Sequence, residues 1–216
     1  MELKTYDQLN ESKLADAVRD LGAECSVMAS VVAAYGMPPL WGRPPGFATL
    51  IQIILEQQVS LASAKACFDR LTQRLGDVSP YNLLSLSDAD LKSIGFSRQK
   101  TTYARHLADA VIAERIDLDS LMHFPDAEVK GELMKLKGIG EWTSDIYLLM
   151  ALLRPDVMPK GDIALHSAWQ SVSGEPRPSS DEFLVIAERW RPYRSTAARL
   201  LWHSYLSEWK LRSAAK

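Results

Sequence analysis

The chain has 216 residues, 47% of them hydrophobic, and carries a formal net charge of −2. That length can bury a core as one domain or as two small lobes, and no apolar run approaches the roughly 18 residues of a membrane span. The first residues show no basic start followed by an apolar stretch, so no secretory signal is expected. The only cysteines, Cys25 and Cys67, suit a reduced compartment and exclude a four-cysteine iron–sulfur cluster.

The near-neutral charge argues mildly against a nucleic-acid partner, but the charge is unevenly distributed. Between residues 184 and 216 the chain has seven Lys or Arg against two Glu. A second basic cluster comprises Arg98, Lys100 and Arg105. Such clusters are most often solvated helix faces, and together they are also consistent with a locally positive groove on a near-neutral protein.

Apolar residues recur at helical spacing through most of the chain, and no convincing strand alternation occurs. In chain order, the expected helices cover 10–35 with a break near Gly22, 47–58, 61–75, a short segment ending at Gly95, 97–114, 126–136, 142–153, a helix that begins at Asp162, 181–189 and 195–212. Prolines at positions 38, 39, 44 and 45 make the stretch before the second helix a linker. The helix at 47–58 is apolar nearly all round and is expected to be buried at the centre. The sequence therefore predicts an all-α protein.

The most informative segment is Leu136–Asp145, which reads LKGIGEWTSD. Gly138 and Gly140 permit backbone angles and close approaches that a side chain would block. Ile139 lies between them and can fill the junction of two helices. A helix that begins at Glu141 would turn its free N–H groups outward, where they can hold a phosphate oxygen. This segment therefore predicts a hairpin between two helices that can grip a nucleic-acid backbone without a basic side chain.

A carboxylate follows this hairpin: Asp162 lies 22 residues after Gly140 in the sequence. One helix and one loop are enough to return the chain over that separation. The carboxylate of Asp162 is therefore expected to lie near the gripped strand. An Asp before an apolar helical run is also a good N-cap, and both roles can hold together.

Three further segments accompany the hairpin. They are residues 53–60 (IILEQQVS), residues 91–100 (LKSIGFSRQK), and residues 190–195 (WRPYRS) with Trp202 after them. With the hairpin and Asp162, these segments resemble the helix–hairpin–helix (HhH-GPD) DNA glycosylase superfamily, and most closely its DNA-3-methyladenine glycosylase II branch. The matches span about residues 46 to 205. A helix–hairpin–helix turn alone is common among DNA-binding proteins, whereas four segments in this order are quite specific.

The resemblance implies a particular architecture. The fold would be the two-lobe helix–hairpin–helix DNA glycosylase fold, without the extra N-terminal α+β domain that longer relatives carry. The central lobe would comprise residues 46–160, with the helix–hairpin–helix at about 126–153. The terminal lobe would comprise residues 1–45 together with 161–216.

The resemblance also assigns the chemistry of glycosidic bond cleavage to Asp162. Breaking the C1′–N bond passes through a sugar cation, which a nearby carboxylate stabilises and towards which it can orient a water molecule. Branches that also cut the sugar–phosphate backbone have a Lys nucleophile directly after the position of Glu141. This chain has Trp142 there, so a monofunctional enzyme with water as the nucleophile is expected. Gly161 stands where the family often has a second acid, which leaves the details of water positioning open.

The remaining site residues also follow from the resemblance. Aromatic rings attract an electron-poor alkylated purine, and the implied base pocket consists of Trp142, Trp202 and, offset by one residue, Tyr147. The implied DNA-binding residues are Gly138, Ile139, Gly140, Thr143, Gln57 and Gln58. Of these, Gln58 stands at the position of the side chain that fills the gap left by the flipped base, although a polar helix end is the plainer interpretation. Glu56 occupies a position that is usually Gly in the family.

Few cofactors are expected. The resemblance implies that the carbonyls of Met134, Leu136 and Ile139 hold a structural Na⁺ or K⁺. No other cofactor is expected to be required, and the presence of only two cysteines excludes a four-cysteine iron–sulfur cluster. The four histidines show no zinc-ligand spacing.

The expected function is hydrolysis of the N-glycosidic bond of alkylated purines in double-stranded DNA, which starts base-excision repair. The candidate bases are 3-methyladenine, 7-methylguanine and ethenoadenine, and the protein is expected to act as a monomer in the cytoplasm of a bacterium or the nucleus of a eukaryote. Two alternatives stay open. One is a non-catalytic DNA-damage-binding protein that keeps the hairpin, and the other is a glycosylase for oxidised or deaminated bases.

Overall fold

The computed structural model describes residues 5–214 and confirms an all-α protein, since no strand occurs among these residues. The α-helices are α1 (Glu11–Glu24), α2 (Ser26–Tyr35), α3 (Phe47–Glu56), α4 (Leu61–Leu75), α5 (Pro80–Ser85), α6 (Asp88–Ile94), α7 (Arg98–Ile112), α8 (Asp126–Met134), α9 (Glu141–Met150), α10 (Ile163–Ser173), α11 (Ser180–Ala187) and α12 (Arg194–Ala214). Short 3-10 helices, η1 (Ser120–His123) and η2 (Glu188–Trp190), complete the set. Within the described chain, no helix is both long and apolar enough to cross a bilayer.

The chain forms two compact units. The middle unit comprises Arg43–Leu152 with Thr5 and Tyr6, and the terminal unit comprises Asp7–Gly42 together with the described residues from Leu153 onward. The sequence predicts boundaries at 45/46 and 160/161, whereas the units divide at 42/43 and 152/153. Leu153 is held in the terminal unit by a hydrogen bond of 2.7 Å from the Leu9 N–H to its carbonyl.

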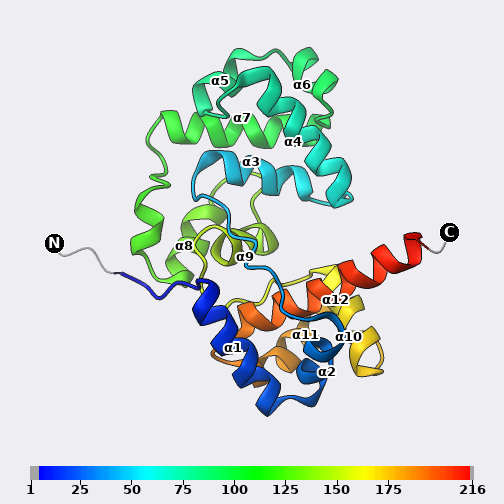
Figure 1. The fold of residues 1–216 in the computed structure, drawn as a ribbon. Helices are drawn as coiled ribbons and strands as arrows, with labels where there is room; N and C mark the ends of the chain where they lie inside the picture. The colour runs from blue at the N-terminus through cyan, green and yellow to red at the C-terminus, as the bar shows by residue number, and fades with distance from the viewer. Residues whose placement is uncertain (1–4, 215–216) are drawn as a thin grey trace. The chain divides into compact units, whose positions relative to one another are not determined.

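Helix α3 forms the centre of the middle unit. Seven of its ten residues are buried, and α4, α7 and α9 pack against it. Figure 1 shows α3 between α7 on one side and α9 on the other, with α5 and α6 beyond α7. A helix that is apolar nearly all round needs neighbours on several sides, which is why it lies at the centre. This position confirms the prediction of a central buried helix in this segment, although the helix ends at Glu56 rather than at residue 58.

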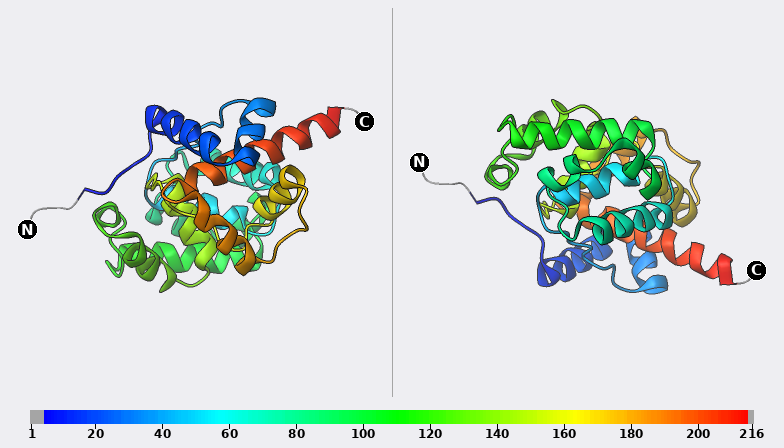
Figure 2. Two further views of the ribbon diagram at one scale, coloured as in Figure 1. Left: turned by 90° about the horizontal axis from the view of Figure 1, so that it is seen from below. Right: turned by 90° about the horizontal axis from the view of Figure 1, so that it is seen from above.

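Helix α12 organises the terminal unit. Helices α1, α2 and α10 contact it, as Figures 1 and 2 show. Helix α1 presents an amphipathic face, with Leu14, Ala17, Val18 and Leu21 buried, and the Asn10 side chain caps its first turn. The terminal unit thus joins the two ends of the described chain in one core.

Two details differ from the sequence prediction. The break predicted near Gly22 lies instead at Cys25, whose extended backbone separates α1 from α2. Gly22 remains inside α1, because a single helical glycine costs only about 1 kcal/mol and the packed face outweighs it. Helices α5 and η1 are not predicted by the sequence, because they are too short for a hydrophobic period to be visible.

Candidate functional site

The predicted hairpin connects α8 to α9 in the middle unit. Gly138 has a φ of +89°, which favours glycine, and a Cβ atom there would lie 2.1 Å from the Tyr103 Cγ. The backbone of the turn is therefore pressed against an aromatic ring. Gly140 differs, since its φ is −108° and no atom lies within 4 Å of its Cβ position. Within the protein, the backbone angle and the close approach therefore require glycine at Gly138, and neither requires it at Gly140.

Gly140 instead serves as the N-cap of α9. It has no side chain that could accept a hydrogen bond from the first-turn N–H groups, and no side-chain cap is present. Ile139 next to it is 5% exposed, and its N–H donates to the Leu136 carbonyl at 3.1 Å. The apolar side chain therefore fixes the turn from inside, as the sequence predicts. An α9 terminus without a side-chain cap suits an anion such as phosphate.

Two other helices hold the hairpin in place. From the end of α3, the Gln57 amide donates to the Gly138 carbonyl and to the Thr143 hydroxyl, both at 2.9 Å. From α7, the His106 Nδ1 accepts a hydrogen bond of 3.3 Å from the Lys137 N–H. Gln57 and Thr143, both predicted to touch DNA, thus also bind each other inside the protein.

The segment after α3 has an unusual backbone. Gln58 has a φ of +56° and an exposed side chain, at the position predicted to enter the DNA duplex. Glu56, just before it, binds the Arg43 guanidinium through two hydrogen bonds of 2.8 and 3.0 Å. Lys100 donates to the Leu55 carbonyl at 2.6 Å. The departure from the family pattern at Glu56 therefore has a physical reason, since its carboxylate pairs with a cation that the linker supplies.

The predicted aromatic residues of the middle unit differ in accessibility. Trp142, in the first turn of α9, is half-buried, whereas Tyr147 is 0% exposed. The Tyr147 hydroxyl accepts a hydrogen bond of 2.9 Å from the Gly46 N–H, and burial raises its pKa to about 12. Tyr147 thus joins α9 to the start of α3, and Trp142 is the more accessible of the two rings.

In the terminal unit, Asp162 occupies the N-cap of α10. Its Oδ1 accepts hydrogen bonds from the Leu165 N–H at 3.0 Å and from the Trp202 Nε1–H at 3.3 Å. Asp162 and Trp202 are each 8% exposed. The structure thus brings Asp162 and Trp202 together, and the capping role that the sequence allows is present.

His166 lies one turn after Asp162 on α10. Burial lowers its pKa, and the nearby Asp162 carboxylate raises it in opposition. Its ring lies 5.0 Å from that of Phe183, and its buried Nε2 has no hydrogen-bond partner among the described residues. A buried imidazole therefore lies near the Asp162 carboxylate.

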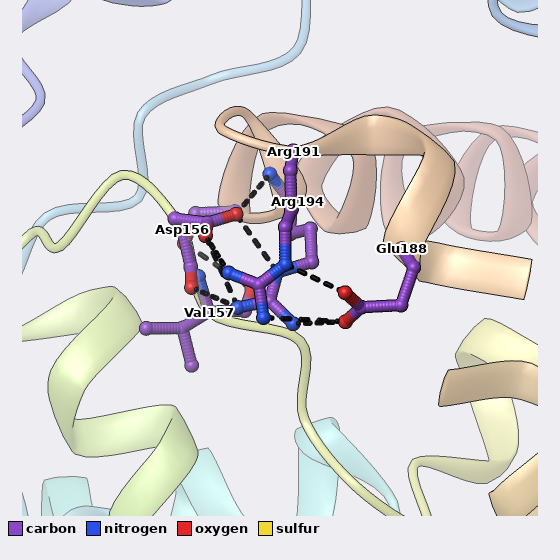
Figure 3. A network of polar contacts seen from close by, with 6 residues as sticks. Asp156, Val157, Glu188, Arg191 and Arg194 are labelled. Atoms are coloured by element: carbon purple, nitrogen blue, oxygen red, sulfur yellow. Dashed lines mark hydrogen bonds and ion pairs between the residues drawn. The ribbon is translucent and has the colours of Figure 1, made fainter. Parts of the chain in front are cut away.

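The loop before Asp162 is fixed by the segment that resembles the family's C-terminal signature (Figure 3). Arg194 donates to the Asp156 carboxylate at 2.8 Å and to the Asp156 carbonyl at 2.9 Å, and it also binds Glu188. Arg191 reaches the same carboxylate at 2.6 Å, and the Ser195 hydroxyl accepts from the Val157 N–H at 2.9 Å. This signature therefore holds the loop that leads to Asp162.

The carbonyls predicted to hold a monovalent cation lie at the end of α8 and in the hairpin. Met134 ends α8, Leu136 follows it, and Ile139 lies in the turn. The Leu136 carbonyl already accepts the Ile139 N–H, but a carbonyl oxygen has a second lone pair for an ion. The donor set therefore fits a small hard cation. Among the described residues, no group of three or more His, Cys, Asp or Glu comes together to hold a metal ion.

Sequence reasoning missed several residues that support these sites: Arg43, Tyr103, His106, Asp156 and His166. Each acts through a contact that is distant in the chain or through burial, which helical spacing does not reveal.

A family model described as the HhH-GPD superfamily of base excision DNA repair proteins matches residues 51–192. A DNA-3-methyladenine glycosylase of Bacillus subtilis is 27% identical over 181 residues, which cover 78% of this chain and 59% of that protein. The chain therefore spans less than two-thirds of the length of this relative.

Solved structures show the same likeness. A DNA-3-methyladenine glycosidase from Bacillus halodurans superposes with a TM-score of 0.73 at 27% identity, covering 93% of this chain and 92% of that one. The Schizosaccharomyces pombe 3-methyladenine DNA glycosylase in complex with abasic DNA gives a TM-score of 0.77 at 25% identity, covering 87% and 95%. The chain belongs to the HhH-GPD superfamily of base excision DNA repair proteins, and the relatives it resembles carry the names of the DNA-3-methyladenine glycosylase branch.

Proposed function

We propose that this protein is a monofunctional DNA glycosylase that hydrolyses the N-glycosidic bond of alkylated purines in duplex DNA. The observation that carries the proposal is the Asp162 carboxylate, held at the start of α10 by the Leu165 N–H and the Trp202 indole. The candidate substrates are 3-methyladenine, 7-methylguanine and ethenoadenine. Release of the base would be the first step of base-excision repair.

The carboxylate supplies the electrostatic part of the reaction. As the C1′–N bond breaks, positive charge develops on the sugar, and an anion fixed beside it lowers the energy of that transition state. The hydrogen bonds to Oδ1 fix the orientation of the Asp162 side chain before the substrate arrives. Water then adds to C1′ and loses a proton, for which the same carboxylate is a suitable acceptor.

Alkylated purines suit this limited machinery. A cationic 3-methyladenine or 7-methylguanine is already a good leaving group, so it does not need a strong general acid. Indole faces attract a flat cation by stacking and by cation–π interaction. The half-buried Trp142 offers such a face, whereas Trp202 is 8% exposed and its indole N–H binds Asp162. For these two cationic bases, the proposal therefore asks of the protein only aromatic binding and one carboxylate.

Cleavage of the sugar–phosphate backbone is not part of the proposal. A lyase needs an amine that forms a Schiff base with the sugar. The position directly after Glu141 is Trp142, which has no amine, and Lys137 is exposed at the hairpin with its backbone N–H bound to His106. Water is therefore the proposed nucleophile.

The hairpin is the proposed grip on the DNA. The N–H groups at the start of α9 would bind one phosphate, the carbonyls of the turn would hold a Na⁺ or K⁺ ion, and the exposed Gln58 would fill the space left by the flipped base. The protein would act as a monomer on double-stranded DNA.

The decisive experiment is the release of free base from DNA that carries N-methylated purines, compared between the parent and Asp162→Asn. Asn retains the capping acceptor and the oxygen that Trp202 contacts, so the fold should survive. We expect release by the parent and a loss of about 100-fold or more in the variant. Asp181→Asn is the matched control, because Asp181 is an exposed carboxylate of the same unit.

The other outcomes distinguish the alternatives. DNA binding without release of any methylated base would favour a non-catalytic damage-binding protein. Release of oxidised or deaminated bases from a lesion panel, with methylated bases untouched, would favour a different glycosylase specificity. Undiminished release by Asp162→Asn would contradict the assigned role of the carboxylate.

A further inference from the structure

We propose that His106 is a positioning residue for the DNA grip, because it sets the orientation of the hairpin backbone from α7. This role rests on the proposed function, since it supposes that the hairpin holds DNA. The observation behind it is a hydrogen bond of 3.3 Å from the Lys137 N–H to the His106 Nδ1, which joins residues 31 apart in the chain.

The bond defines the state of the imidazole. Only an unprotonated Nδ1 has a lone pair for the Lys137 N–H, so the neutral ring carries its proton on Nε2. The bond also turns the Lys137 N–H towards α7. That donor is consequently unavailable to a phosphate, and the grip must use the N–H groups that follow it, from Gly138 onward.

A second contact from α7 acts on the next residue. Tyr103 lies one turn before His106 on the same side of the helix, and its ring occupies the space where a Gly138 side chain would be. The Gln99 amide donates to the Tyr103 hydroxyl at 2.6 Å and steadies the ring. Helix α7 therefore supports two consecutive residues of the turn, one by a hydrogen bond and one by packing.

Helix α3 holds the turn by a different group. The Gln57 amide donates to the Gly138 carbonyl at 2.9 Å, while His106 accepts from the N–H of the preceding residue. With an acceptor and a donor fixed on adjacent residues, the peptide groups between them lose their freedom to rotate. The N–H groups of Gly138 and Gly140 thus point in a set direction before DNA arrives, which lowers the entropy cost of binding a phosphate.

The test compares two variants of His106. His106→Asn places an amide oxygen where Nδ1 now accepts, whereas His106→Leu fills similar space without an acceptor. Affinity is measured for a duplex with a stable abasic-site analogue, which needs no chemistry. A single lost hydrogen bond of about 0.5–1.5 kcal/mol corresponds to about 2- to 12-fold weaker binding, which we expect for His106→Leu. We expect His106→Asn to bind within about twofold of the parent.

Two further readouts separate positioning from general stability. Amide exchange of the DNA-free protein should show a protected Lys137 N–H in the parent and in His106→Asn, and a faster-exchanging one in His106→Leu. Single-turnover base release at saturating DNA should be the same in all three proteins, because the grip acts on binding and not on the bond that breaks. Thr102→Ala is the matched control on the same helix: its exposed hydroxyl donates only within α7, to the Arg98 carbonyl, so this variant should bind as the parent does.

Several results would overturn the inference. One is equal DNA affinity of the parent and both His106 variants. Another is an equal loss of DNA affinity in both variants. A third is unchanged amide exchange at Lys137 in His106→Leu. A lower melting temperature of His106→Leu with unchanged affinity would assign His106 to the core alone. If the parent binds the duplex but releases no base, the proposed chemistry fails while the affinity series still decides on His106. If the parent binds no duplex, both proposals fail.

Discussion

Helices α9 and α10 differ in how the free N–H groups of their first turns are bonded. Helix α9 begins at Gly140, which has no side chain to bond the free N–H groups of the first turn, whereas α10 begins at Asp162, whose carboxylate bonds the Leu165 N–H. An N-terminus without a side-chain cap suits a phosphate from outside, and a capped one fixes a carboxylate in a defined orientation. The comparison suggests that the hairpin acts through its backbone and α10 through a side chain.

The supports differ in the same sense. At the hairpin, side chains from α3 and α7 bind backbone groups of the turn, namely the Gly138 carbonyl and the Lys137 N–H. At α10, an indole binds the side-chain carboxylate of Asp162, to which the proposed function assigns the reaction. Changes at the hairpin should therefore alter DNA affinity and stability, and changes beside Asp162 should alter the rate of base release.

The largest expected effect is that of Gly138→Ala. The new Cβ would lie 2.1 Å from the Tyr103 Cγ, the ring atom bonded to the Tyr103 Cβ. The φ of +89° also disfavours any side chain at this position. We expect a loss of about 1–3 kcal/mol in unfolding free energy from strain and overpacking, and at least about tenfold weaker DNA binding, because the turn must shift. Thermal unfolding and fluorescence anisotropy with a labelled duplex measure the two quantities.

Gly140→Ala is the control that sharpens the comparison. Its φ of −108° suits alanine and no protein atom lies within 4 Å of the new Cβ, so the loss in unfolding free energy should not exceed about 1 kcal/mol, the usual cost of alanine at an N-cap. A selective loss of DNA affinity in this variant would support phosphate binding at α9. Equal stability of the two alanine variants would show that Tyr103 does not hold the turn as described.

The second effect concerns the indole beside the carboxylate. Trp202→Phe keeps an aromatic face but removes the hydrogen bond of 3.3 Å from Nε1–H to Asp162, and we expect base release at saturating DNA to slow about tenfold. Trp190→Phe is matched to it, because the buried Trp190 Nε1 has no hydrogen-bond partner among the described residues. Both variants lose packing, so both should be less stable. A similar rate loss in both would mean that packing, and not the bond to Asp162, controls the rate.

The sequence predicted these regions unequally, for physical reasons. The hairpin and Asp162 could be found because glycine spacing, an apolar plug and a capping Asp are local features of the chain. The contacts of His106 and Tyr103 with the turn could not, since a polar or aromatic residue on a helix does not reveal what it faces. Likewise, nothing in the sequence shows that Tyr147 turns its hydroxyl to the Gly46 N–H, a partner 101 residues away.

Glu56 is a residue whose identity is explained only by a contact in the folded protein. As a residue in a position usually occupied by glycine, Glu56 has no explanation from the sequence alone. In the fold it is the bidentate partner of Arg43, with only 9% of its side chain exposed. Departures from a family pattern become interpretable once a partner from another part of the chain is known, because a half-buried charge requires one.

The smallest expected effect is the pH dependence of stability that His166 confers. It tests whether water is excluded from the surroundings of Asp162. Burial lowers the pKa of His166 from its ordinary value of 6.5, against the opposing pull of Asp162 and with the help of Arg177. The unfolded chain therefore binds a proton at a higher pH than the folded one. The contribution of His166 to the stability of the fold is fully present above that ordinary pKa and is lost as the pH falls through the pKa of the folded protein.

His166→Phe keeps a ring against Phe183 and cannot bind the proton, so its unfolding free energy should decline less between about pH 7.5 and pH 5 than that of the parent. Urea unfolding of both proteins at the two pH values measures this difference. An identical decline would mean that the imidazole is hydrated in the folded protein, and the site at α10 would then be as open to water as the start of α9.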